Sequence, residues 1–193
     1  MDHAEATDLL LDAAGKLFYE RGVQAVGMDA IRAESGVSLK RLYQCFPSKD
    51  TLVEAYLRRR DTRWRDSLTG YVAARDDDPL AVFDWLHDWF REPGFRGCAF
   101  VNSFGELGPT APGVTAAVRA HKAAVRVYLR TLTTPETLAD QLFALLEGAT
   151  VTAAISGDPA IALTSKAAAR ALLAEAAGPS LSNRQEGPQP TGE

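Results

Sequence analysis

Residues 28–57, MDAIRAESGVSLKRLYQCFPSKDTLVEAYL, contain the pattern that decides the fold. The segment predicts two short helices joined by a tight turn, followed by the start of a third helix. Gly36 stands where a helix C-terminus needs a residue that adopts positive φ, and Ser38 is a favourable N-cap for the next helix. Pro47 ends that second helix, and Ser48 can cap the third.

The second of these helices, over residues 39–46, carries basic, polar and aromatic side chains on its exposed side. Leu42 and Phe46 lie one helical turn apart and predict the buried side. The opposite side carries Leu39, Lys40, Arg41, Tyr43 and Gln44. A short second helix with basic and aromatic side chains on its exposed face is typical of the recognition helix of a helix-turn-helix, which enters the major groove of DNA.

This arrangement resembles the DNA-binding domain of the TetR family of bacterial transcription regulators. The resemblance rests on Ala13-Ala14, Leu17-Phe18, Gly22, Ile31, Gly36-Val37-Ser38, Leu42-Tyr43, Phe46, Ser48-Lys49 and Leu52. It implies double-stranded operator DNA as a partner, contacted by Met28, Ser38, Leu39, Lys40, Arg41, Tyr43, Gln44 and Lys49. The resemblance also implies a homodimer, formed through the last two helices, and a small-molecule effector that binds in a C-terminal helical domain.

The composition sets limits on how the chain could bind nucleic acid. The 193 residues are 46% hydrophobic and 24% charged, and the formal net charge is −4. Such a chain buries a sizeable core, and its contacts with DNA must come from a local basic surface. Residues 38–49 provide that surface, because they contain Lys40, Arg41 and Lys49 and no acidic residue.

The chain has no feature that directs it to a membrane in our interpretation of the sequence. The first ten residues are acidic and lack the positive region of a signal peptide. We identify no apolar run with the length of about 20 residues that a membrane span needs. The sequence therefore predicts a cytoplasmic protein without a membrane partner.

Helical periodicity predicts an all-α chain in three parts. Residues 1–50 form the helix-turn-helix domain, in which a first helix begins at about Thr7 after a frayed arm. Residues 51–178 form an effector-binding and dimerisation domain, and residues 179–193, rich in Ser, Gln, Pro and Gly, form a disordered tail. A run of three arginines at 58–60 in the long helix after Ser48 is interpreted as a solvated helix face rather than a phosphate contact.

Aromatic side chains are concentrated after residue 79 and allow two interpretations, a filled core or an apolar cavity. The predicted ligand-binding set is Trp85, Trp89, Phe104, Glu106, His121, Val125 and Tyr128. His121 is either a core residue or a ligand contact, and Glu106 either binds a cationic group or caps a neighbouring helix. The low charge of the set predicts a largely apolar, partly aromatic effector rather than a polyanion such as a nucleotide.

The last two predicted helices are rich in Ala and Leu. Small side chains let helices approach closely, so the pair predicts a homodimer interface, with an intramolecular hairpin as the alternative. The predicted interface consists of Leu142, Leu146, Ala149, Ala153, Leu163, Ala167 and Ala171.

No segment has the pattern of a catalytic or metal site. Phosphate-binding glycine loops, nucleophile elbows and metal-spaced His/Cys clusters are lacking, so we expect no catalytic residue, metal or cofactor. Redox-responsive regulation through Cys45 or Cys98 remains an alternative, as do two other classes: a helical enzyme that processes small molecules and a protein-binding adaptor. We favour a repressor that a small apolar or aromatic effector releases from a palindromic operator.

Overall fold

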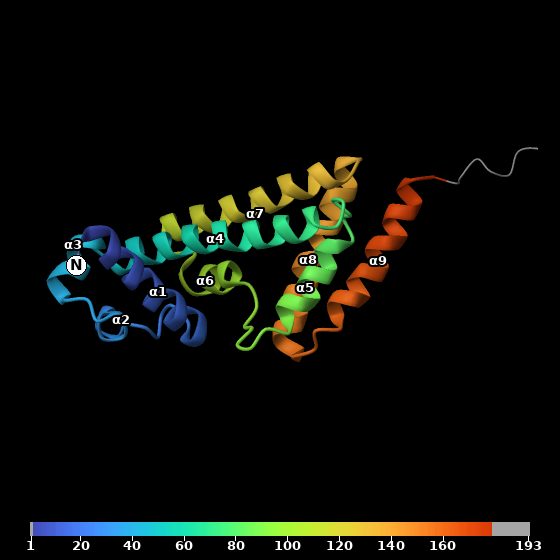
Figure 1. The fold of residues 1–193 in the computed structure, drawn as a ribbon. Helices are drawn as coiled ribbons and strands as arrows, with labels where there is room; N and C mark the ends of the chain where they lie inside the picture. The colour runs from blue at the N-terminus through green and yellow to red at the C-terminus, as the bar shows by residue number, and fades with distance from the viewer. Residues whose placement is uncertain (1, 179–193) are drawn as a thin grey trace, which may run out of the picture.

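The structure is a computed structural model that describes residues 2–178. Over these residues the predicted all-α fold is confirmed, with no strand (Figure 1). The helices are α1 (His3–Arg21), α2 (Met28–Ser35), α3 (Leu39–Cys45), α4 (Lys49–Ala73), α5 (Ala81–Phe90), α6 (Ala99–Leu107), α7 (Pro112–Leu132), α8 (Glu136–Ser156) and α9 (Ile161–Ala176). The predicted tail, residues 179–193, lies outside the described residues.

The first helix begins earlier than the sequence predicts. The Asp2 carboxylate accepts a hydrogen bond of 2.8 Å from the backbone N–H of Glu5, which caps the helix. Ala6 and Leu10 are both 0% exposed, so the first turns of α1 are also held by the core. The prediction of a frayed arm before Thr7 is therefore wrong.

The predicted glycine turn and serine caps of the helix-turn-helix are present. Gly36 ends α2 with a φ of 68°, a left-handed conformation that favours glycine. The Ser38 side chain accepts from the backbone N–H of Arg41 at 3.3 Å at the start of α3. Ser48 and Thr51 form a reciprocal capping box at the start of α4.

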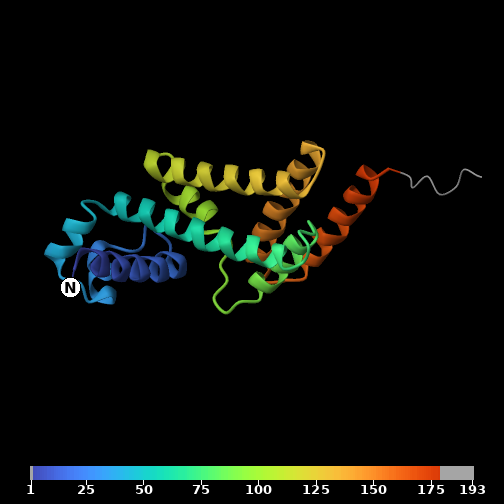
Figure 2. The same ribbon diagram turned by 45° about the horizontal axis from the view of Figure 1, so that its top comes forward.

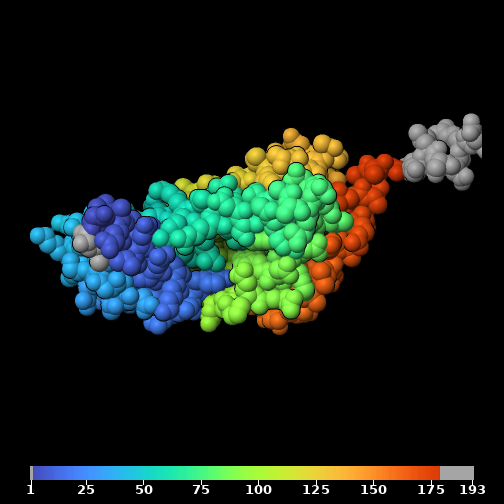
Figure 3. Space-filling model, in the orientation of Figure 1, coloured from blue at the N-terminus to red at the C-terminus, as the bar shows by residue number. Residues whose placement is uncertain are grey.

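Buried apolar side chains form two clusters, one towards each end of α4. The first cluster joins α1, α2 and α3, which we call the head, to the first half of α4, to α6 and to the start of α7. The second cluster joins the end of α4 to α5, α8, α9 and the second half of α7. Figures 1 and 2 show α4 and α7 side by side between the head and the group of α5, α8 and α9. Figure 3 shows the resulting elongated shape, with α4 along the face in view.

The predicted domain boundary at residue 50 falls at the start of α4, where the two parts of the chain share a core. Phe100 of α6 and Val114 of α7 belong to the same cluster as Leu10 of α1. The two predicted domains therefore do not have separate hydrophobic cores. Their division into a DNA-binding part and an effector part remains a prediction about function.

One side of helix α8 packs inside the chain. Its side chains Leu142, Leu146, Ala149 and Ala153 are 1%, 2%, 2% and 2% exposed, because α5, α7 and α9 pack against α8. These four side chains leave no surface for a second copy, which corrects their assignment to a dimer interface. By length and composition α8 is also apolar enough to cross a membrane, which corrects the prediction that no apolar run has this length; part of its apolar surface packs in the core.

A buried polar group connects α4, α6 and α7. The His121 ring, 3% exposed, stacks on Phe100 with centroids 3.6 Å apart, and its Nδ1 lies 2.7 Å from Oδ1 of Asp61. Arg65 donates two further hydrogen bonds to the Asp61 carboxylate, at 2.9 and 2.8 Å. Burial, which outweighs the contact with Asp61, lowers the pKa of His121 to about 4, so the ring is neutral at pH 7. Of the two interpretations of His121, the structure shows the core residue.

We predict that His121 makes the stability of this protein depend on pH. Its pKa falls from 6.5 to about 4 on folding, so the unfolded chain binds more protons between these values. The free energy of unfolding should be unaffected by His121 above its unfolded pKa and should fall as the solution is acidified. The loss should be about 2 kcal/mol between about pH 7.5 and about pH 5.

The measurement is urea unfolding at both pH values and one protein concentration, compared with His121→Asn. The asparagine amide can donate to Asp61 but does not titrate, so the variant should lose about 2 kcal/mol less on acidification than the parent. Equal losses in the two proteins would show that His121 does not titrate as the buried contact requires.

Candidate functional site

Helix α3 presents one side to solvent and one to the core. Leu42 is 0% exposed and fixes the inner side, whereas Leu39 and Tyr43 are 46% and 47% exposed. Lys40 and Gln44 are also exposed, and Arg41 is half-buried. The predicted exposed side of α3 is therefore present, with Arg41 at its margin, and its role in reading DNA stays a prediction.

The remaining predicted DNA contacts surround this helix. Ser38 is exposed and caps α3, and Met28 is half-buried against the core at the start of α2. Lys49 is the first residue of α4, and its Nζ donates a hydrogen bond of 3.4 Å to the backbone carbonyl of Gln24. All eight predicted residues thus lie on or beside α2, α3 and the start of α4.

Glu106 at the end of α6 holds the loop between α1 and α2. Its carboxylate accepts from the backbone N–H groups of Val23 at 3.1 Å and Gln24 at 2.6 Å. The Gln24 side chain donates back to the carbonyl of Glu106 at 2.6 Å. Gly22 makes this approach possible, because its φ of 84° strains other residues and a Cβ would lie 3.1 Å from the Glu106 carboxylate. Of the two interpretations of Glu106, the structure favours the one in which it satisfies a neighbouring backbone.

The seven predicted ligand-binding residues do not meet in one cavity. Trp85 and Trp89 line one pocket, whereas Phe104 is 47% exposed on a different one between α6, α7 and α8. Val125 is 1% exposed in the second core cluster, and Tyr128 packs against that cluster. The helical pattern identified which faces are apolar, but the packing of the helices separates these faces.

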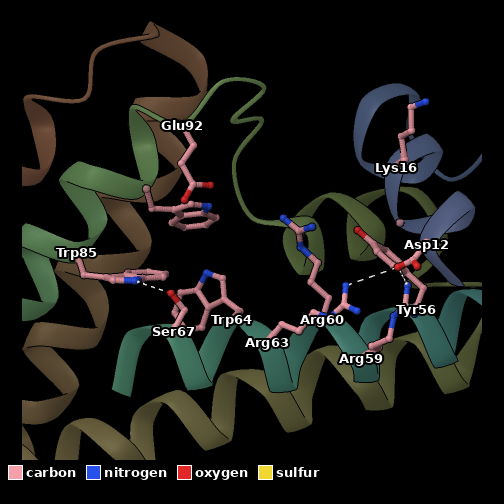
Figure 4. Close-up of a pocket in the computed structure, with 12 residues that line it drawn as sticks. Asp12, Lys16, Tyr56, Arg59, Arg60, Arg63, Trp64, Ser67, Trp85 and Glu92 are labelled. Carbon is pink, nitrogen blue, oxygen red and sulfur yellow. Dashed lines mark hydrogen bonds and ion pairs between the residues drawn. The ribbon is translucent and has the colours of Figure 1, made fainter. Parts of the chain in front are cut away.

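The pocket with the two tryptophans has a volume of about 320 Å³ and lies between α1, α4 and α5 (Figure 4). Its lining is Asp12, Gly15, Lys16, Tyr56, Arg59, Arg60, Arg63, Trp64, Ser67, Trp85, Trp89 and Glu92. Figure 4 shows Trp64 and Trp85 at one end, Tyr56 and Asp12 at the other, and Arg60 between them. Tyr56, Arg60 and Trp64 follow one another at intervals of four residues, so the helical period alone could have placed them on one face of α4.

The two cysteines lie apart in the structure. Cys45 of α3 has its Sγ 3.6 Å from Nδ1 of His3, and Cys98 precedes α6 with its Sγ 3.5 Å from Nζ of Lys122. Both are free thiols. Among residues 2–178, no three His, Cys, Asp or Glu side chains come together as possible metal ligands.

Comparison with known proteins identifies the family. Residues 10–56 match the family model described as bacterial regulatory proteins, tetR family. The chain is 32% identical to a TetR-family transcriptional regulator from Streptomyces coelicolor, over 89% of each chain and with a TM-score of 0.78. This chain belongs to the TetR family of transcriptional regulators. The resemblance predicted from residues 13–52 is thereby confirmed, and the head is its helix-turn-helix DNA-binding part.

Further relatives of this TetR-family regulator agree in fold. A putative TetR transcriptional regulator from Streptomyces avermitilis is 29% identical, over 89% of this chain and 98% of its own, with a TM-score of 0.74. The reduced form of NemR from E. coli shares the fold at 22% identity, over 87% and 97% of the chains, with a TM-score of 0.78. An uncharacterized HTH-type regulator from Mycobacterium tuberculosis is 40% identical over 58 residues, which are 30% of this chain and 29% of that relative.

We predict that Lys49 contacts a phosphate of bound DNA. A phosphate contact releases counterions, so replacing Lys49 with Ala should weaken binding to all DNA sequences and flatten the slope of log K against log salt by about 1. The measurement is fluorescence anisotropy of labelled duplex DNA over a range of salt concentrations. Lys166→Ala is the control, because Lys166 pairs with Asp84 at the other end of the molecule and should leave the slope unchanged. An unaltered slope for Lys49→Ala would remove Lys49 from the DNA contacts.

Proposed function

We propose that this TetR-family regulator is a homodimeric repressor that binds a palindromic operator and leaves it when a small molecule with an aromatic part binds. One observation carries the proposal: α1 packs against α2 and α3 in the head and also forms a wall of the tryptophan-lined pocket. A ligand in this pocket therefore touches the element that supports the recognition helix.

The exposed side of α3 supports the DNA-binding part of the proposal. Lys40 and Arg41 can donate hydrogen bonds to O6 and N7 of guanine in the major groove, and Gln44 can bind adenine. Tyr43 contacts a phosphate or a thymine methyl group, and Lys49 contacts a phosphate. Two such heads, related by a two-fold axis, fit successive major grooves of a palindromic site.

Exposed apolar and small side chains at four-residue spacing on α8 and on α9 support the homodimer. Ile155, Val151 and Leu163 are 82%, 42% and 44% exposed, and the small side chains Ala167 and Ala171, which follow Leu163 at four-residue spacing on α9, are exposed as well. Exposed apolar side chains that form a continuous surface mark an association site, and small residues allow close helix packing. We therefore place the interface on this outward side and retain Leu163, Ala167 and Ala171 from the sequence prediction.

In the dimer, a ligand would release DNA if it changed the position of each head relative to α4. The two-fold axis fixes the distance between the two α8–α9 pairs, so the distance between the recognition helices depends on how each head sits on α4. A ligand that favours one head position over another shifts this equilibrium by its difference in affinity for the two states. We place this regulator in the cytoplasm, where its DNA partner would lie.

We predict that Lys40 and Arg41 determine base preference. Replacing either one with Ala should relax the preference at one base pair of each half-site by about 1–3 kcal/mol, because a donor to guanine is lost. The measurement is selection of binding sites from random DNA, followed by affinities for single base changes in the selected site. If both variants bind more weakly but keep the parent's base preference, these residues bind the backbone and not the bases.

We predict that Ile155→Arg yields monomers. The side chain is 82% exposed in the single chain, so arginine should not disturb the fold, but it would place an unpaired charge in the proposed interface. Sedimentation equilibrium measures the assembly, and circular dichroism checks the fold. Leu9→Arg is the control, because Leu9 is 38% exposed on α1 at the opposite end of the molecule and should leave the dimer intact. A dimeric Ile155→Arg would place the interface on another surface.

A further inference from the structure

We propose that the pocket between α1, α4 and α5 is built for a planar aromatic molecule with one anionic group, such as an aromatic carboxylate, and that Arg60 and Tyr56 bind the anionic group. The inference rests on the proposed function, because it names the chemical class of the effector. It differs from the sequence prediction of an effector oriented by few polar groups, none of them cationic.

One end of the pocket is a rigid aromatic wall. Trp85 and Trp89 stack with ring centroids 5.4 Å apart, and Trp64 meets them edge-on at 4.9 and 5.8 Å. The indole N–H of Trp85 donates to the hydroxyl of Ser67 at 3.1 Å, which fixes the orientation of the ring. Preoriented aromatic rings bind a planar aromatic partner through stacking and edge contacts.

Arg60 supplies a positive charge that forms no ion pair among residues 2–178, although the Glu92 carboxylate lines the same pocket. Among residues 2–178, the neighbouring cations have partners: Arg59 pairs with Asp12 at 2.7 Å, and Lys16 pairs with Glu34 at 2.6 Å. The same residues provide no ion pair for Arg60, whose guanidinium carbon lies 4.0 Å from the centroid of the Tyr19 ring. Stacking on Tyr19 holds the guanidinium in place but leaves its N–H groups available to a carboxylate, which can bind them in a bidentate manner.

Tyr56 supplies a hydroxyl that donates to no acceptor among residues 2–178. The residue is 3% exposed and lines the pocket, and within the described chain its buried hydroxyl makes no hydrogen bond of good geometry, although the Arg60 side chain lies close enough to oppose the rise of its pKa. A buried hydroxyl without a partner is costly, and it indicates a site where a bound group completes the contact. Burial raises the pKa of Tyr56 to about 12, so the hydroxyl remains protonated at pH 7 and can donate to an anion.

The size and the charge of the pocket limit the ligand further. A volume of about 320 Å³ is near the lower end for small-molecule sites and fits a compact ring system better than a nucleotide. Four basic and two acidic side chains line the pocket, and one of the acids, Asp12, is already paired with Arg59. The excess of positive charge favours an anionic ligand over a cationic one.

The experiment compares 2-naphthoate with 2-naphthamide, which has the same rings and no charge. Isothermal titration calorimetry on the DNA-free protein should show that the parent binds the carboxylate about tenfold more tightly than the amide. Arg60→Met should abolish that preference. Arg58→Met should retain it, because Arg58 lies on the same helix but outside the pocket, where it pairs with Glu54.

The Arg60→Met variant loses the stacking on Tyr19 and could unfold for that reason. The Tyr56→Phe variant then provides an independent test of the pocket. The variant removes only the unpartnered hydroxyl, so its melting temperature should be equal to or above that of the parent, while its affinity for 2-naphthoate should fall about fivefold. Equal affinities for carboxylate and amide, a preference that survives Arg60→Met, an unchanged affinity in Tyr56→Phe, or no binding of either probe would each overturn the proposal.

Adding the same probe to the protein–DNA complex separates this inference from the proposed function. If 2-naphthoate binds through Arg60 but does not release DNA, the assignment of the pocket is supported and ligand-controlled repression is contradicted. If DNA is bound and no probe enters the pocket, the DNA-binding function stands and the assignment of the pocket is wrong.

Discussion

The structure depends on the continuity of α4, a helix of 25 residues that contributes to both hydrophobic clusters. Leu52, Val53 and Leu57 pack against the head, and Leu68 and Val72 pack against α5 and the C-terminal helices. No glycine or proline interrupts the helix between these two sets of contacts. A continuous helix transmits rotation and translation as a unit, so a change at one end of α4 alters how the other end is placed.

Two further connections restrict the head on α4. On one side, the Glu106 carboxylate binds the backbone after α1 and so joins α6 to the head. On the other side, Arg59 of α4 bridges to Asp12 of α1 at the pocket. The pocket thus lies beside the junction between the head and the rest of the chain, where a bound ligand would contact both α1 and α4. A site in the centre of the second cluster would have to act through more intervening side chains.

The buried polar groups of this protein differ in what they imply. His121 and Asp61 satisfy one another and Arg65, so this group stabilises the junction of α4, α6 and α7 and requires no ligand. The hydroxyl of Tyr56 has no such partner within the described residues, although it is as deeply buried. The two residues differ in whether their buried polar atoms have partners, and this difference, together with the position of Tyr56 in the pocket, supports the proposed binding role of Tyr56.

The sequence by itself determined the elements that depend on neighbouring residues. The glycine turn, the serine caps, the period of apolar positions and the exposed side of α3 are local properties, and from them the all-α fold, the family and the recognition surface could be predicted. The tertiary structure decided which apolar helix faces pack against one another. A helical period shows that Leu146, Val125 and Trp85 are inward-facing but does not show whether their partner is the same chain, a second copy or a ligand. It also could not place Arg60 in a pocket, because that pocket exists only where α1 and α5, distant in sequence, both pack against α4.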